Sequence, residues 1–177
     1  MCVIVYNLGY SEVSYEFAES MFNHNSDGFG ITYLDEFKTL KTFDKNLATS
    51  LVTAKRPFVA HYRAATSGGI SKETTHPVSI GGNNKLFFNG VCHKYANHPK
   101  GDTTGIAEHL KKTLRKSWVA ELMALGSKFA LVSKNGSSKE AKASLIGNWT
   151  QENGVWYSNL YFKNGWVIGG SRGNYHV

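Results

Sequence analysis

The sequence has few cysteines: Cys2 and Cys92 are the only two in 177 residues. Two cysteines in a chain of this length make neither a disulfide framework nor a zinc site with four cysteine ligands. The seven histidines show no metal-ligand spacing with a third ligand nearby, and no glycine-rich phosphate loop is present. We therefore expect no metal and no nucleotide cofactor.

The sequence also lacks long apolar runs. No stretch approaches the roughly 18 apolar residues that a membrane-spanning helix needs. The first residues have neither the basic region nor the long apolar run of a signal peptide. We expect a cytoplasmic protein with reduced thiols and no membrane partner.

Acidic residues are fewer than basic ones: 13 Asp and Glu against 20 Lys and Arg give a formal net charge of +7. Such a charge raises nucleic acid as a partner. The charge is scattered, however, and its densest stretch, at 111–116, is more typical of a solvated helix face. Nucleic-acid binding is therefore a weakly supported expectation.

Prolines number only three, and 41% of the residues are hydrophobic, which is typical of a folded globular protein. We expect one domain over residues 1–177. The order of elements predicts an α+β fold, a four-layer αββα sandwich in which two mostly antiparallel sheets lie between helices. The apolar pattern predicts strands at 2–6, 29–34, 37–43, 58–62, 85–88, 128–134, 143–146, 155–162 and 166–168, and helices at 15–22, 45–53, 103–116 and 118–125.

Cys2 is the first candidate for chemistry. Removal of Met1, which is expected before a small residue, exposes a thiol and a free α-amine on the same residue. The amine has a reference pKa near 8, so it can accept the thiol proton and make the residue nucleophile and base together. The competing interpretation is that Cys2 is simply a small core residue in the first strand.

A series of short motifs follows Cys2 in a fixed order. They are Asn-Ser-Asp-Gly-Phe-Gly at 25–30, His-Tyr-Arg-Ala-Ala-Thr-Ser-Gly at 61–68, Thr-His-Pro at 75–77, Phe-Asn-Gly at 88–90 and Gly-Asp-Thr at 101–103. In this order they resemble the class II glutamine amidotransferases, which are N-terminal nucleophile (Ntn) hydrolases. The resemblance covers roughly the first 115 residues, and its specificity comes from order and spacing.

The resemblance implies a mechanism for Cys2. The thiol attacks the side-chain amide of L-glutamine, forms a thioester and releases ammonia. The side-chain amide of Asn89 and the backbone N–H of Gly90 stabilise the oxyanion. Without the resemblance, Asn89-Gly90 is an ordinary hairpin turn.

The resemblance also implies how the amino-acid end of glutamine is bound. Arg63 holds the α-carboxylate, with Thr66 and Ser67 adding hydrogen bonds, and Asp102 binds the α-ammonium. The alternatives are a strand-end charge for Arg63 and a helix N-cap for Asp102. His61 and His76 are interpreted as packing or hydrogen-bonding residues, since the terminal amine already supplies the base.

Two positions depart from the family pattern. Phe88 stands where a histidine is common before Asn-Gly, and Ala64 stands where an aromatic residue often follows the arginine. Both departures suggest a different cover over the glutamine pocket. Familiar members also continue into a synthase domain, so we expect a separate acceptor or synthase protein as a partner of this chain.

Two other functions fit the same sequence. One is a terminal-cysteine amidase that acts on another linear amide and has no need of Arg63 and Asp102. The other is a catalytically silent binding module that uses its basic surface for nucleic acid or protein. Compact stand-alone relatives occur in phage genomes, so a viral protein in the host cytoplasm is a further expectation.

Overall fold

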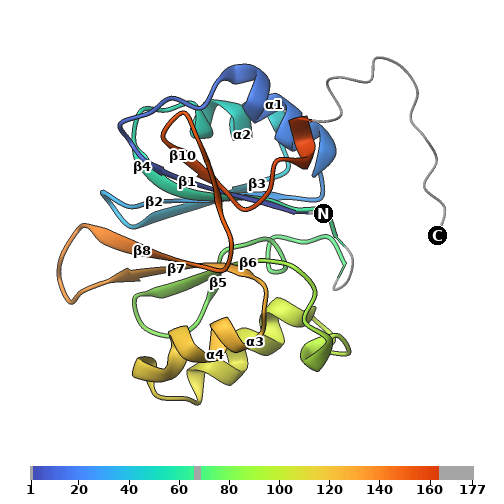
Figure 1. Cartoon of the computed structure of the whole chain (residues 1–177), viewed down its shortest axis with the longest axis vertical. Helices are drawn as coiled ribbons and strands as arrows, with labels where there is room; N and C mark the ends of the chain where they lie inside the picture. The colour runs from blue at the N-terminus through green and yellow to red at the C-terminus, as the bar shows by residue number, and fades with distance from the viewer. Residues whose placement is uncertain (1, 66–68, 164–177) are drawn as a thin grey trace.

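The computed structural model describes residues 2–65 and 69–163, and these form an α+β fold with two antiparallel sheets (Figure 1). The six-stranded sheet has the order β3-β2-β4-β1-β10-β9, and the four-stranded sheet has the order β5-β6-β7-β8. The strands are β1 (Val3–Leu8), β2 (Phe29–Tyr33), β3 (Lys38–Thr42), β4 (Pro57–Tyr62), β5 (Val78–Ser79), β6 (Asn84–Asn89), β7 (Lys128–Lys134), β8 (Ala141–Ile146), β9 (Thr150–Glu152) and β10 (Val155–Tyr157).

The helices lie outside the two sheets, so the fold has four layers. Figure 1 shows α1 (Tyr15–His24) and α2 (Lys45–Val52) on the outer face of the six-stranded sheet. It shows α3 (Asp102–Lys111) and α4 (Trp118–Ala124) on the outer face of the four-stranded sheet, with short 3₁₀ turns at His93–Tyr95 and Arg115–Ser117. The expected α+β class with two antiparallel sheets is thereby confirmed, and the position of the helices is compatible with the expected sandwich.

Three apolar clusters hold the layers together. The first packs α1 and α2 on the six-stranded sheet and includes Met21 and Phe29, and the second packs α3 and α4 on the four-stranded sheet. The third lies between the sheets, where Ile4 and Phe87 are fully buried. Each such side chain contributes about 1.5–3 kcal/mol when it leaves water, so the layers need no disulfide.

Strand β1 lies in the middle of the six-stranded sheet, although it begins at residue 3. It pairs antiparallel with β4, where Val3 faces Tyr62, and with β10, where Val5 faces Tyr157. Val3, Ile4 and Val5 are buried, so the start of the chain is a core strand. Antiparallel pairing therefore brings Cys2 to the end of β4, next to the loop that follows Tyr62.

Most sequence-predicted elements are present, but some boundaries were wrong. The predicted strand 155–162 ends at Tyr157, and residues 161–163 are helical, because Phe162 turns into the core beneath α1. The predicted helix 103–116 ends at Lys111. The sequence pattern also missed the short strands β5 and β9, and the predicted strand 166–168 lies outside the described residues.

A membrane-spanning role finds no support in the helices. Within residues 2–65 and 69–163, none of them has the length and apolar character that crossing a bilayer requires.

Candidate active site

A pocket opens at the end of the sandwich where β1 begins and β4 and β6 end. The cavity volume is about 40 Å³, and the whole hollow, including the open solvent at its mouth, has a volume of about 440 Å³. Four of the sequence-predicted site residues line it, and they come from four separate segments of the chain. The lining residues that the sequence predicted are Cys2, Arg63, Gly90 and Asp102.

The thiol of Cys2 lies against the loop after β4. The backbone N–H of Ala64 donates to Cys2 Sγ at 3.4 Å, and the thiol lies at the same distance from the Ala64 carbonyl oxygen. Burial raises the pKa of the Cys2 thiol, while the hydrogen bond from Ala64 and the charge of Arg63 act in the opposite direction. A thiolate at this position therefore has a donor and a cation nearby, and it needs a base to form.

The loop that carries Ala64 is fixed by the turn before β2. Asp27 Oδ2 accepts a hydrogen bond from the backbone N–H of Ala65 at 2.7 Å, and the Asp27 N–H donates to the Arg63 carbonyl at 2.9 Å. The backbone N–H of Arg63 donates to the Gly28 carbonyl at 2.8 Å. The motif at 25–30 thus positions the loop and does not itself line the pocket.

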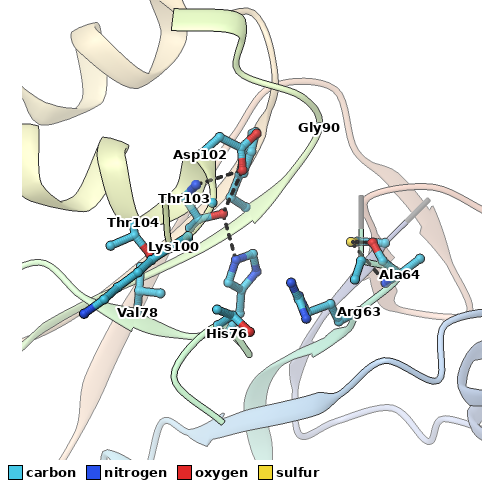
Figure 2. A pocket seen from close by; sticks show the side chains of 14 residues that line it. Arg63, Ala64, His76, Val78, Gly90, Lys100, Asp102, Thr103 and Thr104 are labelled. Carbon is cyan, nitrogen blue, oxygen red and sulfur yellow. Dashed lines mark hydrogen bonds between the residues drawn. The ribbon is translucent and has the colours of Figure 1, made fainter. Parts of the chain in front are cut away.

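Arg63 and Asp102 stand at different sides of the pocket (Figure 2). Arg63 is 6% exposed, and its guanidinium points toward the ring of His76. Asp102 lies above them at the start of α3. Because the Arg63 guanidinium and the Asp102 carboxylate line the same pocket, the pocket can bind a ligand that carries both a carboxylate and an ammonium group.

Asp102 is not the N-cap that the sequence pattern allowed. Gly101, with φ of +85°, is the N-cap of α3, and Asp102 is the first helical residue. Its carboxylate accepts hydrogen bonds from the backbone N–H groups of Cys92 at 2.9 Å and Thr103 at 2.8 Å. Two backbone donors therefore hold the carboxylate in place at the pocket wall.

Gly90 lines the pocket in a conformation that favours glycine. Its φ is +153°, and a Cβ atom there would lie 2.6 Å from the hydroxyl of Ser127. Its neighbour Asn89, the last residue of β6, is 5% exposed and donates from Nδ2 to Ser158 Oγ at 2.8 Å. Asn89-Gly90 is therefore not a hairpin turn, and Asn89 lies just behind the pocket wall.

His61 and His76 form a buried pair with ring centroids 4.0 Å apart. Nε2 of His76 lies 2.9 Å from the hydroxyl of Thr103, and a Cβ on Gly30 would lie 1.8 Å from the His76 carbonyl oxygen. Burial, with the nearby charge of Arg63, lowers the pKa of His76 to about 3, and burial also places the pKa of His61 well below its usual value. Both rings are neutral near pH 7, which agrees with a packing role.

The lowered pKa of His76 predicts that the protein loses stability in mild acid. As the pH falls below about 6.5, the His76 imidazole becomes protonated in the unfolded chain. In the folded protein the same ring stays neutral down to about pH 3. The free energy of unfolding should therefore fall by about 1 kcal/mol per pH unit from this group alone. Urea unfolding of wild type and His76→Gln at pH 7, 6, 5 and 4 measures the difference.

We expect a shallower pH dependence in His76→Gln than in wild type. His93→Gln is the matched control, because His93 is exposed, and it should keep the wild-type dependence. Equal slopes for wild type and His76→Gln would show that the buried ring does not resist protonation.

Two residues that contact the candidate site residues were not found by sequence reasoning. Ser158 and Asn159, directly after β10, are buried and contact Asn89 and the Cys2 carbonyl. The signal for them was a pair of small polar residues inside a predicted strand of aromatic and apolar residues. The proposed glutamine contacts at Thr66 and Ser67 lie outside the described residues.

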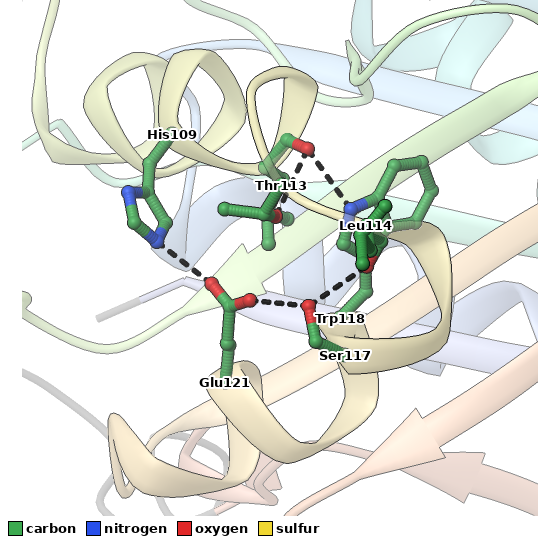
Figure 3. Close-up of polar contacts among 7 residues, drawn as sticks. His109, Thr113, Leu114, Ser117, Trp118 and Glu121 are labelled. Atoms are coloured by element: carbon green, nitrogen blue, oxygen red, sulfur yellow. Dashed lines mark hydrogen bonds and ion pairs between the residues drawn. The ribbon is translucent and has the colours of Figure 1, made fainter.

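A second polar cluster joins α3 to α4 on the far side of the four-stranded sheet (Figure 3). Glu121 lies between two partners: His109 Nε2 is 2.7 Å from its Oε2, and Ser117 donates to its Oε1. The hydroxyl and the imidazole both contact the carboxylate, so the ring does not bind the hydroxyl as a catalytic base must. This cluster serves to join two helices.

Comparison with known proteins adds no assignment: no protein-family model matches the chain, and no curated protein matches it. Within the described residues, no group of three or more His, Cys, Asp and Glu side chains is arranged to hold a metal ion. The case for function therefore depends on the pocket itself.

Proposed function

We propose that the protein is a class II glutamine amidotransferase that hydrolyses L-glutamine through Cys2. The observation that carries this proposal is that Cys2, Arg63, Gly90 and Asp102 line one pocket. A thiol nucleophile, a carboxylate binder, a backbone oxyanion donor and an ammonium binder are the parts that this reaction needs. Successive members of this set are 27 or more positions apart in the sequence, except that Asp102 follows Gly90 by twelve.

The substrate is glutamine with its amino-acid end between Arg63 and Asp102. The guanidinium of Arg63 binds the α-carboxylate, and the carboxylate of Asp102 binds the α-ammonium group. Because Cys2 and Gly90 line the same pocket, the side-chain amide extends toward them. An amide without both charged groups loses these two contacts, so we expect a preference for the free amino acid.

The chemistry begins at the free α-amine of Cys2, after removal of Met1. The amine takes the proton of the thiol, and the sulfur attacks the carbon of the side-chain amide. The Gly90 N–H and the Asn89 side chain stabilise the oxyanion. The protonated amine then gives its proton to the departing nitrogen, ammonia leaves, and water hydrolyses the thioester to glutamate and the free thiol.

The fold supports the same proposal. Two antiparallel sheets between helical layers, with the nucleophile at the start of a central strand, are the arrangement that an Ntn-hydrolase fold requires. Neither step of the reaction calls for a metal or a cofactor. The ammonia passes to a nitrogen acceptor, which we place on a separate synthase or acceptor protein.

Mass spectrometry with a glutamine-like electrophile tests the proposal. Treated with 6-diazo-5-oxo-norleucine, the thiol of Cys2 displaces nitrogen gas and keeps the remainder as one thioether adduct. We expect the intact protein to lack Met1 and to gain one adduct, and we expect excess L-glutamine to prevent it. Cys92→Ala is the matched control and should gain the same adduct, since Cys92 lies in the core beside α3.

The other outcomes separate the alternatives. An adduct on Cys2 that glutamine does not prevent, but another linear amide does, indicates an amidase of different specificity. A chain that retains Met1 and gains no adduct contradicts the glutaminase proposal and favours the binding module.

A further inference from the structure

The segment after β10 contacts both the nucleophile strand and the oxyanion strand. The Ser158 N–H donates to the Ile4 carbonyl at 2.9 Å, and the Ile4 N–H donates to Ser158 Oγ at 2.8 Å. Asn89, at the end of β6 in the other sheet, donates to the same hydroxyl oxygen at 2.8 Å. Ser158 therefore bridges the two sheets at the end of the sandwich that holds the pocket.

The hydroxyl of Ser158 has little freedom. Ser158 is 0% exposed, and a hydroxyl oxygen has two lone pairs, which here accept from Ile4 and Asn89. Lys128 donates through its ammonium group to the Ser158 carbonyl oxygen. Contacts on the hydroxyl, the N–H and the carbonyl fix this residue in one position.

The contact with Ser158 determines the orientation of the Asn89 side-chain amide. Nδ2 carries two hydrogens, and one of them is held by Ser158. The amide is thereby fixed, and in the proposed reaction its second hydrogen serves the oxyanion. Without Ser158, a buried amide would rotate to find another partner, because an unpaired buried donor costs about 1–3 kcal/mol.

Asn159 acts on the nucleophile residue itself. Its Nδ2 donates to the carbonyl oxygen of Cys2 at 2.7 Å, and it is 8% exposed. The carbonyl is the only polar backbone group of Cys2 besides the amine that the chemistry uses. Holding it restrains both the thiol and the amine relative to the pocket.

We propose that Ser158 and Asn159 are positioning residues of the glutaminase site, Ser158 orienting the Asn89 amide and Asn159 orienting Cys2. This inference rests on the proposed function. It gives the segment that contains Ser158 and Asn159 a positioning role in catalysis, although this segment lies some 150 residues from Cys2 in the sequence.

Steady-state kinetics of glutamine hydrolysis test the inference. We expect Ser158→Ala and Asn159→Ala each to lower kcat by about 10- to 100-fold, because small misplacements of catalytic groups have effects of this size. The KM for glutamine should stay within about twofold of wild type, since Arg63 and Asp102 are untouched. Ser20→Ala is the matched control: the Ser20 hydroxyl is also buried and donates to the Phe162 carbonyl at 2.8 Å, away from the pocket.

A double-mutant cycle separates positioning from general damage. If Ser158 acts through Asn89, then Ser158→Ala should change kcat by less than about twofold in an Asn89→Ala background. An undiminished effect in that background, a wild-type kcat in Ser158→Ala, or an equal loss in Ser20→Ala would overturn the role of Ser158. A wild-type kcat in Asn159→Ala would overturn the role of Asn159. A wild-type protein without glutaminase activity would instead overturn the proposed function, and the positioning role with it.

Discussion

Replacement of Cys2 by alanine is expected to reduce glutamine hydrolysis by at least about 10⁴-fold, which is the scale of losing a covalent nucleophile. In the proposed mechanism the thiol forms the thioester, and among the described residues Cys2 is the only cysteine that lines the pocket. Ammonia release from L-glutamine, followed by a coupled assay, measures the loss. Circular dichroism should show an unchanged fold, because alanine fits wherever the larger Cys2 side chain does.

The matched control is the other cysteine. Cys92→Ala should keep the kcat of wild type within about threefold, because the Cys92 side chain packs in the core of the four-stranded sheet and the substitution keeps the backbone N–H that holds Asp102. Glutaminase activity of Cys2→Ala above about 1% of wild type would show that another group is the nucleophile.

The second large effect is expected at the oxyanion. Asn89→Ala removes a side-chain donor while leaving the Gly90 N–H, and the loss of one such donor costs about 10²- to 10³-fold in kcat. The KM should change little, because the donor acts on charge that develops after binding. The same kinetic assay, run at saturating glutamine, measures this loss.

Another buried asparagine on the same strand provides the control. Asn84 is at the opposite end of β6 and donates to the Gly81 carbonyl at 2.9 Å. Asn84→Ala should destabilise the protein by about 1 kcal/mol without lowering kcat. If Asn84→Ala and Asn89→Ala lower kcat alike, the amide of Asn89 has no special role and the loss reflects the strand as a whole.

Much of the fold followed from local patterns. Strand β7 has the predicted bounds, and α2 and β4 differ from prediction by one residue, because each has a clear apolar period and ends at a polar turn or a proline. The predicted element boundaries were wrong where tertiary packing outweighs the apolar periodicity of the sequence. Residues 158–162 are aromatic and apolar enough for a strand, yet Phe162 stabilises the protein more by turning into the cluster beneath α1.

The sequence predicted residues that line the candidate site but not the residues that hold them in place. Residue types and their order identified Cys2, Arg63, Gly90 and Asp102, since a terminal thiol, a strand-end arginine and an Asn-Gly pair are visible one at a time. The structure corrected Asp102 from the N-cap to the first residue of α3 and placed Asn89 behind the pocket wall. A hydrogen-bond partner 69 residues away leaves no local trace, so the sequence marks Ser158 only as a polar residue in an apolar stretch and not as the partner of Asn89.

By itself, the sequence determined the α+β class and the set of chemical groups, because apolar periodicity and residue type are local properties of the chain. Only the tertiary structure decided which of these groups share a pocket. The antiparallel pairing of β1 with β4 brings Cys2 to Arg63, and the packing of the two sheets brings both to Gly90 and Asp102. Those contacts join residues far apart in the chain, and the burial of apolar side chains between the layers is the physical reason that they form.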